Sequence, residues 1–509
     1  MSKIKRMICT LLAMCMVLTF SACKKEADVG DVTSSESKKE ADAGDVTSSE
    51  SKKEADTGDV TLKWYIPLNK QTDLELVNEE VNKITTEKLG IKIDMVIIDN
   101  AAYTERMNMN MAASDDYDIC WIGYLNTFVN AVSKGGLMKI DEFLEKAPAL
   151  KEAIPEYLWG QSKYKGDTYI VPNVQTGVDR SALYFRQDLI EKYNFDITKI
   201  TKTEDVEPFL QIILENEPDV IPFCVGSGVA SLRSLDEEMK LTGEPLVVAV
   251  KDETTGKFTA MDGLEVADTY SRAKKLNEWY EKGYIRKDVA THTDDATDMR
   301  AGKYACWVSS WKPGGVIENE TKYGYDIECT FVSPAFRSPN SASGSALAIG
   351  KDSKHPQEAI KFIELLHTDK ELYNLICYGI EGMHYNKIEE NRIELIKDSG
   401  YSPNANWKFG TVFNAYLLPG QEDDVWEQTK IANETAKTNG LESFLFDNSQ
   451  VKNIITNLNN VVQEYKVVRQ GWRNPDEYWA EFKQKLYDNG FQKYIDEYQR
   501  QLDEYLKEQ

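Results

Sequence analysis

Blocks of strand-like and helix-like hydrophobic pattern alternate along the chain after the first 60 residues. β-rich runs such as TLKWYI and IKIDMVII are separated by a segment with apolar side chains at helical spacing, which Gly90 ends. The predicted order is strand 61–66, helix 73–89, strand 91–98, helix 103–113 and strand 117–123. Strand, helix and strand in close succession form a βαβ unit, so the pattern predicts a parallel sheet.

The same alternation returns further along the chain, which predicts a second α/β block. Thr201 and Glu204 suggest a capping box at the start of one of its helices. Strands are predicted at 164–172, 182–186, 304–308 and 347–350, a hairpin at 247–258, and helices at 187–193, 201–215, 264–282 and 356–366. From about residue 422 nearly all of the chain has helical spacing, with Tyr, Trp and Leu expected in a core. The fold class is therefore α/β with a helical C-terminal region.

The first 22 residues are predicted to be an export leader. A basic start, MSKIKR, precedes an apolar stretch at 7–20 that is too short to span a bilayer. Ser21 and Ala22 then precede Cys23, which resembles a bacterial lipobox with Phe20 where Leu is usual. Cys23 is the expected lipidation site. An ordinary leader with an incidental Cys is the alternative.

Residues 24–61 repeat the sequence KKEADVGDVTSSES with small changes and a period of 14. The segment has no aromatic or large apolar residue, and Gly30, Gly44 and Gly58 with Ser and Thr clusters disfavour a helical repeat. It is predicted to be a disordered tether with a mean reach of roughly 35 Å.

The net charge and the cysteine content exclude some classes of ligand and of fold. A formal net charge of −24 argues against binding to nucleic acid or docking on anionic lipid. Beyond the leader and Cys23, an odd number of cysteines at irregular spacing does not form a disulfide framework, although one pair is possible. Their neighbours are apolar, so they are predicted to be small buried hydrophobes: Cys120, Cys224, Cys306, Cys329 and Cys377.

Recognisable catalytic motifs are absent from the sequence. The four histidines have no metal-binding spacing, no GxSxG motif occurs, and no Gly-Lys pair is followed by the Ser or Thr of a P-loop. With 84 acidic residues, a glycosidase carboxylate pair can be neither selected nor excluded. The sequence therefore favours binding over catalysis, with no cofactor and no metal expected.

Several longer segments carry a resemblance to a known family. They are YDICWIGYLNTFVNAVSKGGLMKIDEFL, KGDTYIVPNVQT, LYFRQDLIEKY, MRAGKYACW, LAIGKDSKHPQEAIKFIELLHTDKE, GIEGMHY and the closing run from GWRNPDEYW. In this order, from about Leu62 to the end, the chain resembles extracellular solute-binding proteins of ABC importers, of the family 1 carbohydrate-binding type. It is similar to a lipoprotein subgroup with a C-terminal domain of unknown function.

The resemblance implies two α/β lobes of a periplasmic-binding-protein-like fold, joined by a hinge, with ligand bound in the cleft between them. The ATPase and the permease would be other chains. The expected domains are a leader at 1–22, a tether at 23–61, lobe 1 at 62–174 plus 342–376, lobe 2 at 175–341 plus 377–421, and a helical region at 422–509 packing on lobe 2.

Loops that follow strands are expected to supply the ligand site, with aromatic faces for sugar rings and amides for hydroxyls. The candidates are Asn69, Tyr124, Asn126, Asn173, Gln175, Ser310, Trp311, Glu381 and His384. Each also has a structural interpretation: the amides as turn caps, Glu381 as a surface ion-pair partner, and His384 as a buried hydrogen-bonding group. Trp121, inside a strand, is assigned to the core.

The expected function is capture of a small solute, above all a sugar or oligosaccharide, and its delivery to membrane permease subunits. The protein is expected to be a lipid-anchored monomer on the extracellular face of the bacterial cell membrane, and not an enzyme. A binder of peptides or another polar solute, a surface-tethered enzyme acting on polysaccharide, and a sensory or adhesive lipoprotein are the alternatives.

Overall fold

The computed structural model describes residues 60–113, 117–225, 246–338, 341–438 and 440–508. The predicted leader, the lipidation site and most of the tether lie outside these residues. The last two residues of the predicted tether, Val60 and Thr61, belong to the first strand, where they pair with the second strand. No helix in the described ranges combines the length and apolarity needed to cross a membrane.

The first sheet has the strand order β2-β1-β3-β15-β6. Its strands are β1 (Val60–Pro67), β2 (Ile91–Ile98), β3 (Ile119–Gly123), β6 (Ile170–Pro172) and β15 (Ser345–Ile349). The predicted βαβ unit is confirmed: α1 (Leu74–Leu89) connects the parallel strands β1 and β2 and ends at Gly90, whose φ of 71° favours glycine. The sheet is not wholly parallel as expected, because β15 runs antiparallel to β3 and β6.

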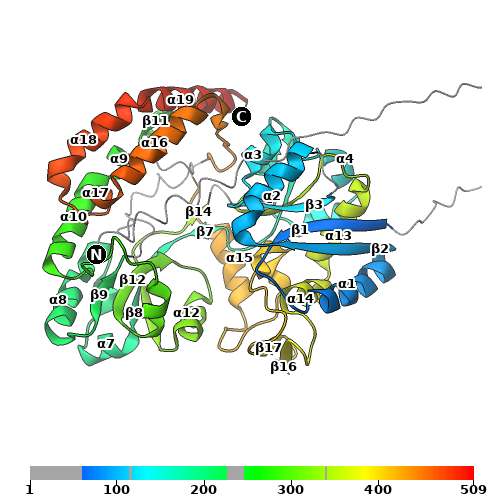
Figure 1. Ribbon diagram of the computed structural model, residues 1–509, viewed down its shortest axis with the longest axis horizontal. Helices are drawn as coiled ribbons and strands as arrows, with labels where there is room; N and C mark the ends of the chain where they lie inside the picture. Colours follow the sequence, from blue (N-terminus) through cyan, green and yellow to red (C-terminus); the bar gives the residue numbers. More distant parts are fainter. Residues whose placement is uncertain (1–59, 114–116, 226–245, 339–340, 439, 509) are drawn as a thin grey trace, which may run out of the picture. The chain divides into compact units, whose positions relative to one another are not determined.

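The second sheet has the order β13-β8-β12-β9 and likewise contains one reversed strand. Its strands are β8 (Ser181–Arg186), β9 (Ile221–Cys224), β12 (Tyr304–Ser310) and β13 (Ile327–Phe331). β12 is parallel to β9, whereas β8 is antiparallel to both β12 and β13. Figure 1 shows the two sheets as separate blocks, the first with the blue strands and the second with the green ones.

Short crossing strands connect the two sheets and explain both reversals. β7 (Val178–Asp179) leads from β6 to β8, and β14 (Phe336–Arg337) leads back toward β15. These two strands pair antiparallel, and Phe336 also pairs with Lys437 on a third crossing segment. The chain thus enters each sheet at the edge near the crossing strands. The strand that begins at this edge, β8 or β15, is therefore antiparallel to its neighbours.

The other α-helices and strands of the described chain follow in sequence order. They are α2 (Asn100–Ala113), α3 (Phe128–Ser133), α4 (Asp141–Leu144), α5 (Pro148–Ala153), α6 (Glu156–Gly160), β4 (Lys163–Tyr164), β5 (Asp167–Thr168), α7 (Gln187–Lys192), α8 (Glu207–Asn216), β10 (Val247–Lys251), β11 (Phe258–Asp262), α9 (Gly263–Val266), α10 (Thr269–Lys282), α11 (Asp295–Arg300), α12 (Gly315–Tyr323), α13 (Pro356–Thr368), α14 (Lys370–Tyr378), β16 (Tyr385–Glu389), β17 (Arg392–Leu395), α15 (Val425–Thr435), α16 (Lys452–Glu464), α17 (Lys466–Arg469), α18 (Pro475–Asp488) and α19 (Phe491–Glu508).

Three local predictions need correction. Asp205, and not Glu204, accepts hydrogen bonds from the backbone and hydroxyl of Thr201, both at 2.9 Å. The helix predicted at 264–282 is two helices, α9 and α10, because Asp268 takes a left-handed conformation with φ 46°. The strand predicted at 164–172 is divided into β4, β5 and β6.

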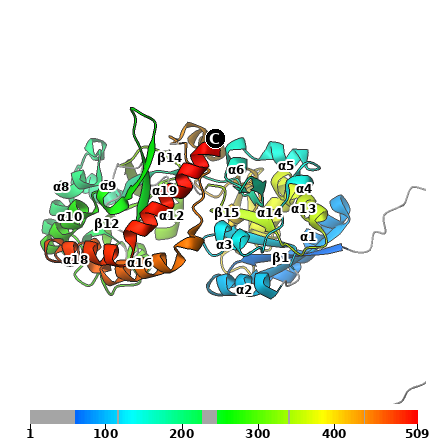
Figure 2. The ribbon, with the colours of Figure 1, turned by 90° about the horizontal axis from the view of Figure 1, so that it is seen from above.

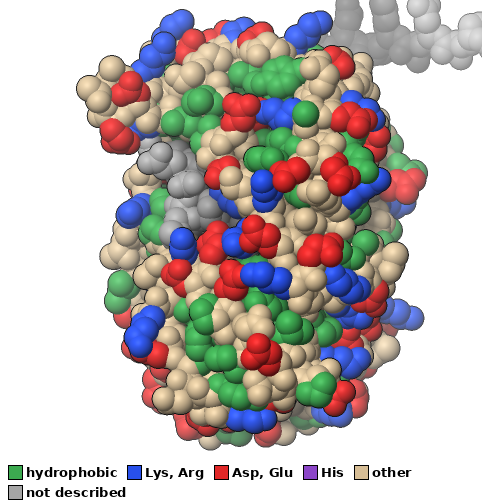
Figure 3. Space-filling view, turned by 90° about the vertical axis from the view of Figure 1, so that its left-hand side faces the viewer, with side chains coloured by type: hydrophobic (Ala, Val, Ile, Leu, Met, Phe, Trp, Pro, Cys, Tyr) green, Lys and Arg blue, Asp and Glu red, His purple; other side chains and the backbone are tan. Residues whose placement is uncertain are grey.

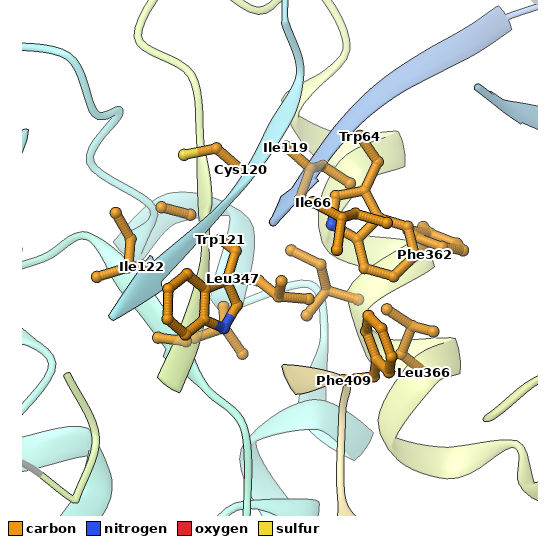
Figure 4. Packing of buried hydrophobic residues seen from close by; sticks show 14 of the residues in the cluster. Trp64, Ile66, Ile119, Cys120, Trp121, Ile122, Leu347, Phe362, Leu366 and Phe409 are labelled. Carbon is orange, nitrogen blue, oxygen red and sulfur yellow. The ribbon is translucent and has the colours of Figure 1, made fainter. Parts of the chain in front are cut away.

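The assignment of residues 377–421 to the second lobe was wrong. Tyr401 and Phe409 belong to the hydrophobic core of the first sheet. The ring of Phe409 meets Trp64 of β1 edge-on at 5.6 Å, and Figure 4 shows Phe409 beside Trp64 and Phe362. The hydroxyl of Tyr401 donates to the carbonyl of Ile376 at 2.8 Å, which ties the segment to α14. The apolar residues after α14 therefore complete the first core.

The C-terminal helices have a core of their own, which they share with the β10–β11 hairpin and α9. Phe446, Tyr494 and Tyr498 pack there with Val247 and Leu264. Figures 1 and 2 both show the red α19 alongside the green hairpin region. The tail also contacts the β4–β5 hairpin, because the hydroxyl of Tyr164 donates to Asp447 Oδ2 at 2.9 Å.

The burial of the described cysteines and the distribution of surface charges agree with what the sequence predicted. The cysteines are free; Cys120, Cys224, Cys306 and Cys377 are buried, and Cys329 is half-buried. Burial raises the pKa of the Cys120 thiol to about 12, so it stays protonated. Figure 3 shows acidic and basic side chains interspersed on one face of the molecule, without a continuous basic area there.

Candidate functional site

Four of the predicted ligand residues lie along one edge of the first sheet. Strands β2, β1, β3 and β6 end at this edge and β15 begins there, as their pairing shows. The residues just beyond those strand ends are Asn100, Asn69, Tyr124, Asn126 and Asn173. We call this edge the first carboxyl edge. It is the edge at which open α/β sheets bind ligands.

A short 3-10 turn, Asn406–Lys408, lies across the first carboxyl edge, and we call it the edge turn. The carbonyl of Trp407 accepts from Ser345 Oγ at 2.9 Å, and the carbonyl of Lys408 accepts from Asn173 Nδ2 at 2.8 Å. Lys408 Nζ donates to the carbonyl of Pro67 at 2.6 Å. The turn is thereby fixed to β15, to β6 and to the end of β1.

Ser345 Oγ takes part in three hydrogen bonds at the centre of this edge. It donates to the Trp407 carbonyl and accepts from Trp121 Nε1 and Asn173 Nδ2, both at 3.0 Å. The Trp121 ring crosses the end of its own strand, so a Cβ on Gly123 would be 2.0 Å from that ring. Only glycine fits at this position.

Tyr124, Trp407 and Trp121 form an aromatic cluster at this edge, which we call the aromatic platform. The rings of Tyr124 and Trp407 are stacked at 6.3 Å with 30° between their planes, and Trp121 is edge-on to both. Trp121 is fully buried, as predicted, whereas Tyr124 is 64% exposed and Trp407 is half-buried. The platform therefore presents flat apolar surface beside polar strand ends, an arrangement suited to a ligand that is apolar on its faces and polar at its rim.

Lys408 is a buried cation within this platform. Its Nζ is 5.1 Å from the ring centroids of both Trp121 and Trp407, and the residue is 3% exposed. Burial lowers the pKa of the Lys408 ammonium to about 8. In the described ranges it forms no ion pair, and its other hydrogen-bonding contact is Asn100 Oδ1 at 3.4 Å.

Two amide atoms at the first carboxyl edge have no hydrogen-bond partner among the described residues. They are Asn173 Oδ1 and Asn126 Nδ2, both in residues that are nearly fully buried. Buried polar atoms are usually paired, so orphaned ones next to an exposed aromatic ring favour a polar ligand. Asn69 is exposed and accepts from Asn100 Nδ2 at 3.2 Å.

The second sheet has a corresponding edge, where β9, β12 and β13 end and β8 begins. The predicted residues Ser310 and Trp311 lie here, at the end of β12. Trp311 is half-buried and meets Phe331 edge-on at 5.1 Å. The Arg180 guanidinium is 3.3 Å from the centroid of Phe331 and 5.6 Å from that of Trp311. We call this the second carboxyl edge.

The other three predicted residues lie elsewhere. Gln175 is on the crossing segment, where its carbonyl accepts from Asn433 Nδ2 at 2.9 Å. Glu381 is exposed and pairs with Lys387 at 3.4 Å. His384 is buried; its Nδ1 accepts from the Ile380 backbone at 2.8 Å, and its Nε2 is 3.2 Å from Asp73 Oδ2. These contacts fit the structural alternatives for Glu381 and His384.

Sequence reasoning missed Trp407, Lys408, Ser345 and Arg180. Trp407 had a usable signal, since NANWK is an Asn-rich loop in which a core tryptophan is less expected. Ser345 and Lys408 had none, because their roles depend on contacts across more than 60 residues of chain. No group of three or more potential metal ligands occurs in the described ranges.

The chain belongs to the family of bacterial extracellular solute-binding proteins, whose model matches residues 69–371. A second model, a domain of unknown function, matches residues 440–507, which cover most of the C-terminal helices. The family, the two-sheet architecture and the helical tail confirm the resemblance seen in the sequence.

Particular relatives extend this assignment. The chain is 29% identical over 458 residues to a carbohydrate ABC transporter substrate-binding protein of Streptococcus pneumoniae, covering 88% of this chain and 91% of that protein. The structure of the N-glycan transport solute-binding protein NgtS of S. pneumoniae is similar with a TM-score of 0.79 and 26% identity, covering 88% of this chain and 99% of that one. NgtS has also been solved with Man1GlcNAc and with Man5GlcNAc, with TM-scores of 0.71 and 0.69.

Proposed function

We propose that this protein captures a carbohydrate outside the cell and delivers it to the permease subunits of an ABC importer. The observation that carries the proposal is the aromatic platform, in which exposed Tyr124 is stacked on Trp407 at the first carboxyl edge. Sugar rings have apolar C–H faces and a rim of hydroxyls, so an exposed aromatic face beside amide groups matches both. The names and glycan complexes of the pneumococcal relatives support the same class of ligand.

The ligand would contact both carboxyl edges, with the crossing strands as the hinge. We propose the following contacts: Asn69, Tyr124, Asn126, Asn173 and Trp407 from the first edge, Ser310 and Trp311 from the second edge, and Gln175 from the crossing segment. Lobe 1 would then comprise residues 62–174 and 342–421, and lobe 2 residues 175–341. The helices after residue 422 would form the additional region.

The predicted leader and tether support a proposal for where the protein is located. We propose that Cys23 is lipidated and that the repeat at 24–61 holds a monomeric binding body close to the membrane. The protein would release the bound sugar unchanged, as a role in transport requires. A peptide or another polar solute is the competing ligand class.

Titration of the chain without its leader and Cys23, residues 24–509, with Man1GlcNAc, Man5GlcNAc and short peptides tests this function. A ligand at a hundred times its Kd adds about 2.7 kcal/mol to the free energy of unfolding, so a saturable rise in Tm is expected with a glycan. Y124A and W407A should each weaken glycan binding by about tenfold or more, which corresponds to about 1.4 kcal/mol.

Y487A is the matched control, because Tyr487 is 39% exposed on α18 and belongs to neither carboxyl edge. It should bind glycan as the unmodified protein does. A Tm shift with peptides alone would assign the protein to the competing class. Production of new reducing ends during incubation would show that it is an enzyme.

A further inference from the structure

We infer that Lys408 is a positioning residue for the aromatic platform: its ammonium group, packed against both Trp121 and Trp407 and bonded to the end of β1, fixes the surface on which a ligand ring packs. The inference rests on the proposed function, because it concerns the same site. It adds a role for a residue that is itself almost inaccessible to ligand.

The ammonium group restrains both tryptophan rings together. Its two distances of 5.1 Å to the ring centroids are within the range of about 6 Å in which a cation is attracted to an aromatic face. The hydrogen bond of 2.6 Å to the Pro67 carbonyl fixes the cation relative to β1. Rotation of either ring away from the platform would therefore lose an attraction to a charge that cannot follow it.

The backbone of the edge turn restrains Trp407 from the other side. Its carbonyl and that of Lys408 accept from Ser345 and Asn173, and Ser345 in turn accepts from the Trp121 indole. Side-chain and backbone contacts of the turn thus lead to the same pair of rings. Tyr124, which packs on both, receives its orientation from them.

A charge at this position is unfavourable for folding alone. A buried ammonium without a carboxylate partner loses hydration that the Pro67 carbonyl, the longer contact to Asn100 Oδ1 and two rings only partly replace. An apolar side chain of similar length would fill the same space without that loss. The organisation of the platform explains why the position is charged, since functional sites commonly sacrifice stability for geometry.

The test compares K408M and K408R with the unmodified chain, residues 24–509, using Man1GlcNAc and Man5GlcNAc as probes. We expect K408M to keep or raise the Tm, by up to about 2 °C, while its Kd for glycan rises by about tenfold or more. Its near-UV circular dichroism should lose tryptophan bands that W407F also loses. K408R keeps the cation and should recover most of the affinity.

K430M is the matched control, because Lys430 Nζ is also 5.1 Å from an aromatic centroid, that of Phe413, but lies on α15. It should bind normally. Unchanged affinity in K408M, or an affinity loss accompanied by a drop in Tm of several degrees, would overturn the positioning role. If the unmodified chain binds neither glycan, the proposed ligand fails first. The spectra of the unliganded proteins then decide, and an unaltered K408M spectrum would overturn the inference.

Discussion

The two carboxyl edges share one motif but build it in different ways. Each places a cation against two aromatic rings: Lys408 with Trp121 and Trp407 at the first edge, and Arg180 with Trp311 and Phe331 at the second. At the second edge all three residues are at or next to the ends of β8, β12 and β13. At the first edge the cation and one ring come from a turn far along the chain.

This difference shows which contacts fix the positions of the side chains at each edge. At the second edge, strand pairing fixes the positions of the aromatic residues. The cation there is the Arg180 guanidinium, which also donates to the Ser333 carbonyl at 3.2 Å. The first edge depends on a network of side-chain bonds around Ser345 and on a fully buried ring. We therefore expect the first edge to be more sensitive to substitution than the second, which three predictions test.

The largest expected loss of stability and binding comes from replacing Gly123 at the first edge. G123A should lower the free energy of unfolding by up to about 3 kcal/mol and abolish most ligand binding, because its Cβ would be 2.0 Å from the Trp121 ring and 2.8 Å from the Gly344 carbonyl. Urea denaturation measures this. G315A is the comparison near the second edge, where the nearest atom is the flexible Lys312 Cγ at 3.3 Å. Equal losses in the two variants would remove the contrast between the edges.

Titration of Lys408 should give the next largest effect. Its pKa is about 8 in the folded protein, below the ordinary value of 10.5, so the unfolded chain holds more protons between these values. The free energy of unfolding should therefore rise with pH from about 8 to 10.5, relative to K408M, by at most about 3 kcal/mol. Denaturation across this pH range checks the difference. R180M should keep the slope of the unmodified chain, since guanidinium groups stay protonated there.

The smallest expected effect compares two buried serines. S345A leaves the buried Trp121 indole without its acceptor and should cost about 2 kcal/mol of unfolding free energy. S333A at the second edge removes the acceptor of the Ser181 backbone bond at 2.7 Å and should cost about 1 kcal/mol. Calorimetry of both variants gives the order. A larger loss in S333A would show that the second edge depends on side-chain hydrogen bonds at least as much as the first edge does.

The site residues that could be predicted from the sequence are those at strand ends, whereas those placed by long-range contacts could not be predicted. Trp311 and Tyr124 directly follow strands with a clear hydrophobic pattern, so the rule that ligands meet strand ends was enough to select them. Lys408 is separated from Pro67 by 341 residues. No local sequence pattern predicts that this lysine is buried beside two tryptophans. The fold class and most helices and strands were predictable because they depend on periodicity. The reversed strands β8 and β15 were not, because their direction depends on where the chain crosses.

The crossings also decide in which half of the molecule each end of the described chain lies. In the described chain, segments pass between the sheets at β7, at β14 and at Lys437. An odd number of passages leaves the two chain ends in different halves: β1 starts the first sheet, whereas the last helices share a core with the β10–β11 hairpin. If Cys23 carries the lipid, the predicted flexible tether joins the membrane to the first lobe, so both lobes stay free to move and only their separation changes on closure. The distance between one label on α1 and one on α19 would then report closure, whereas the position of either label alone would not.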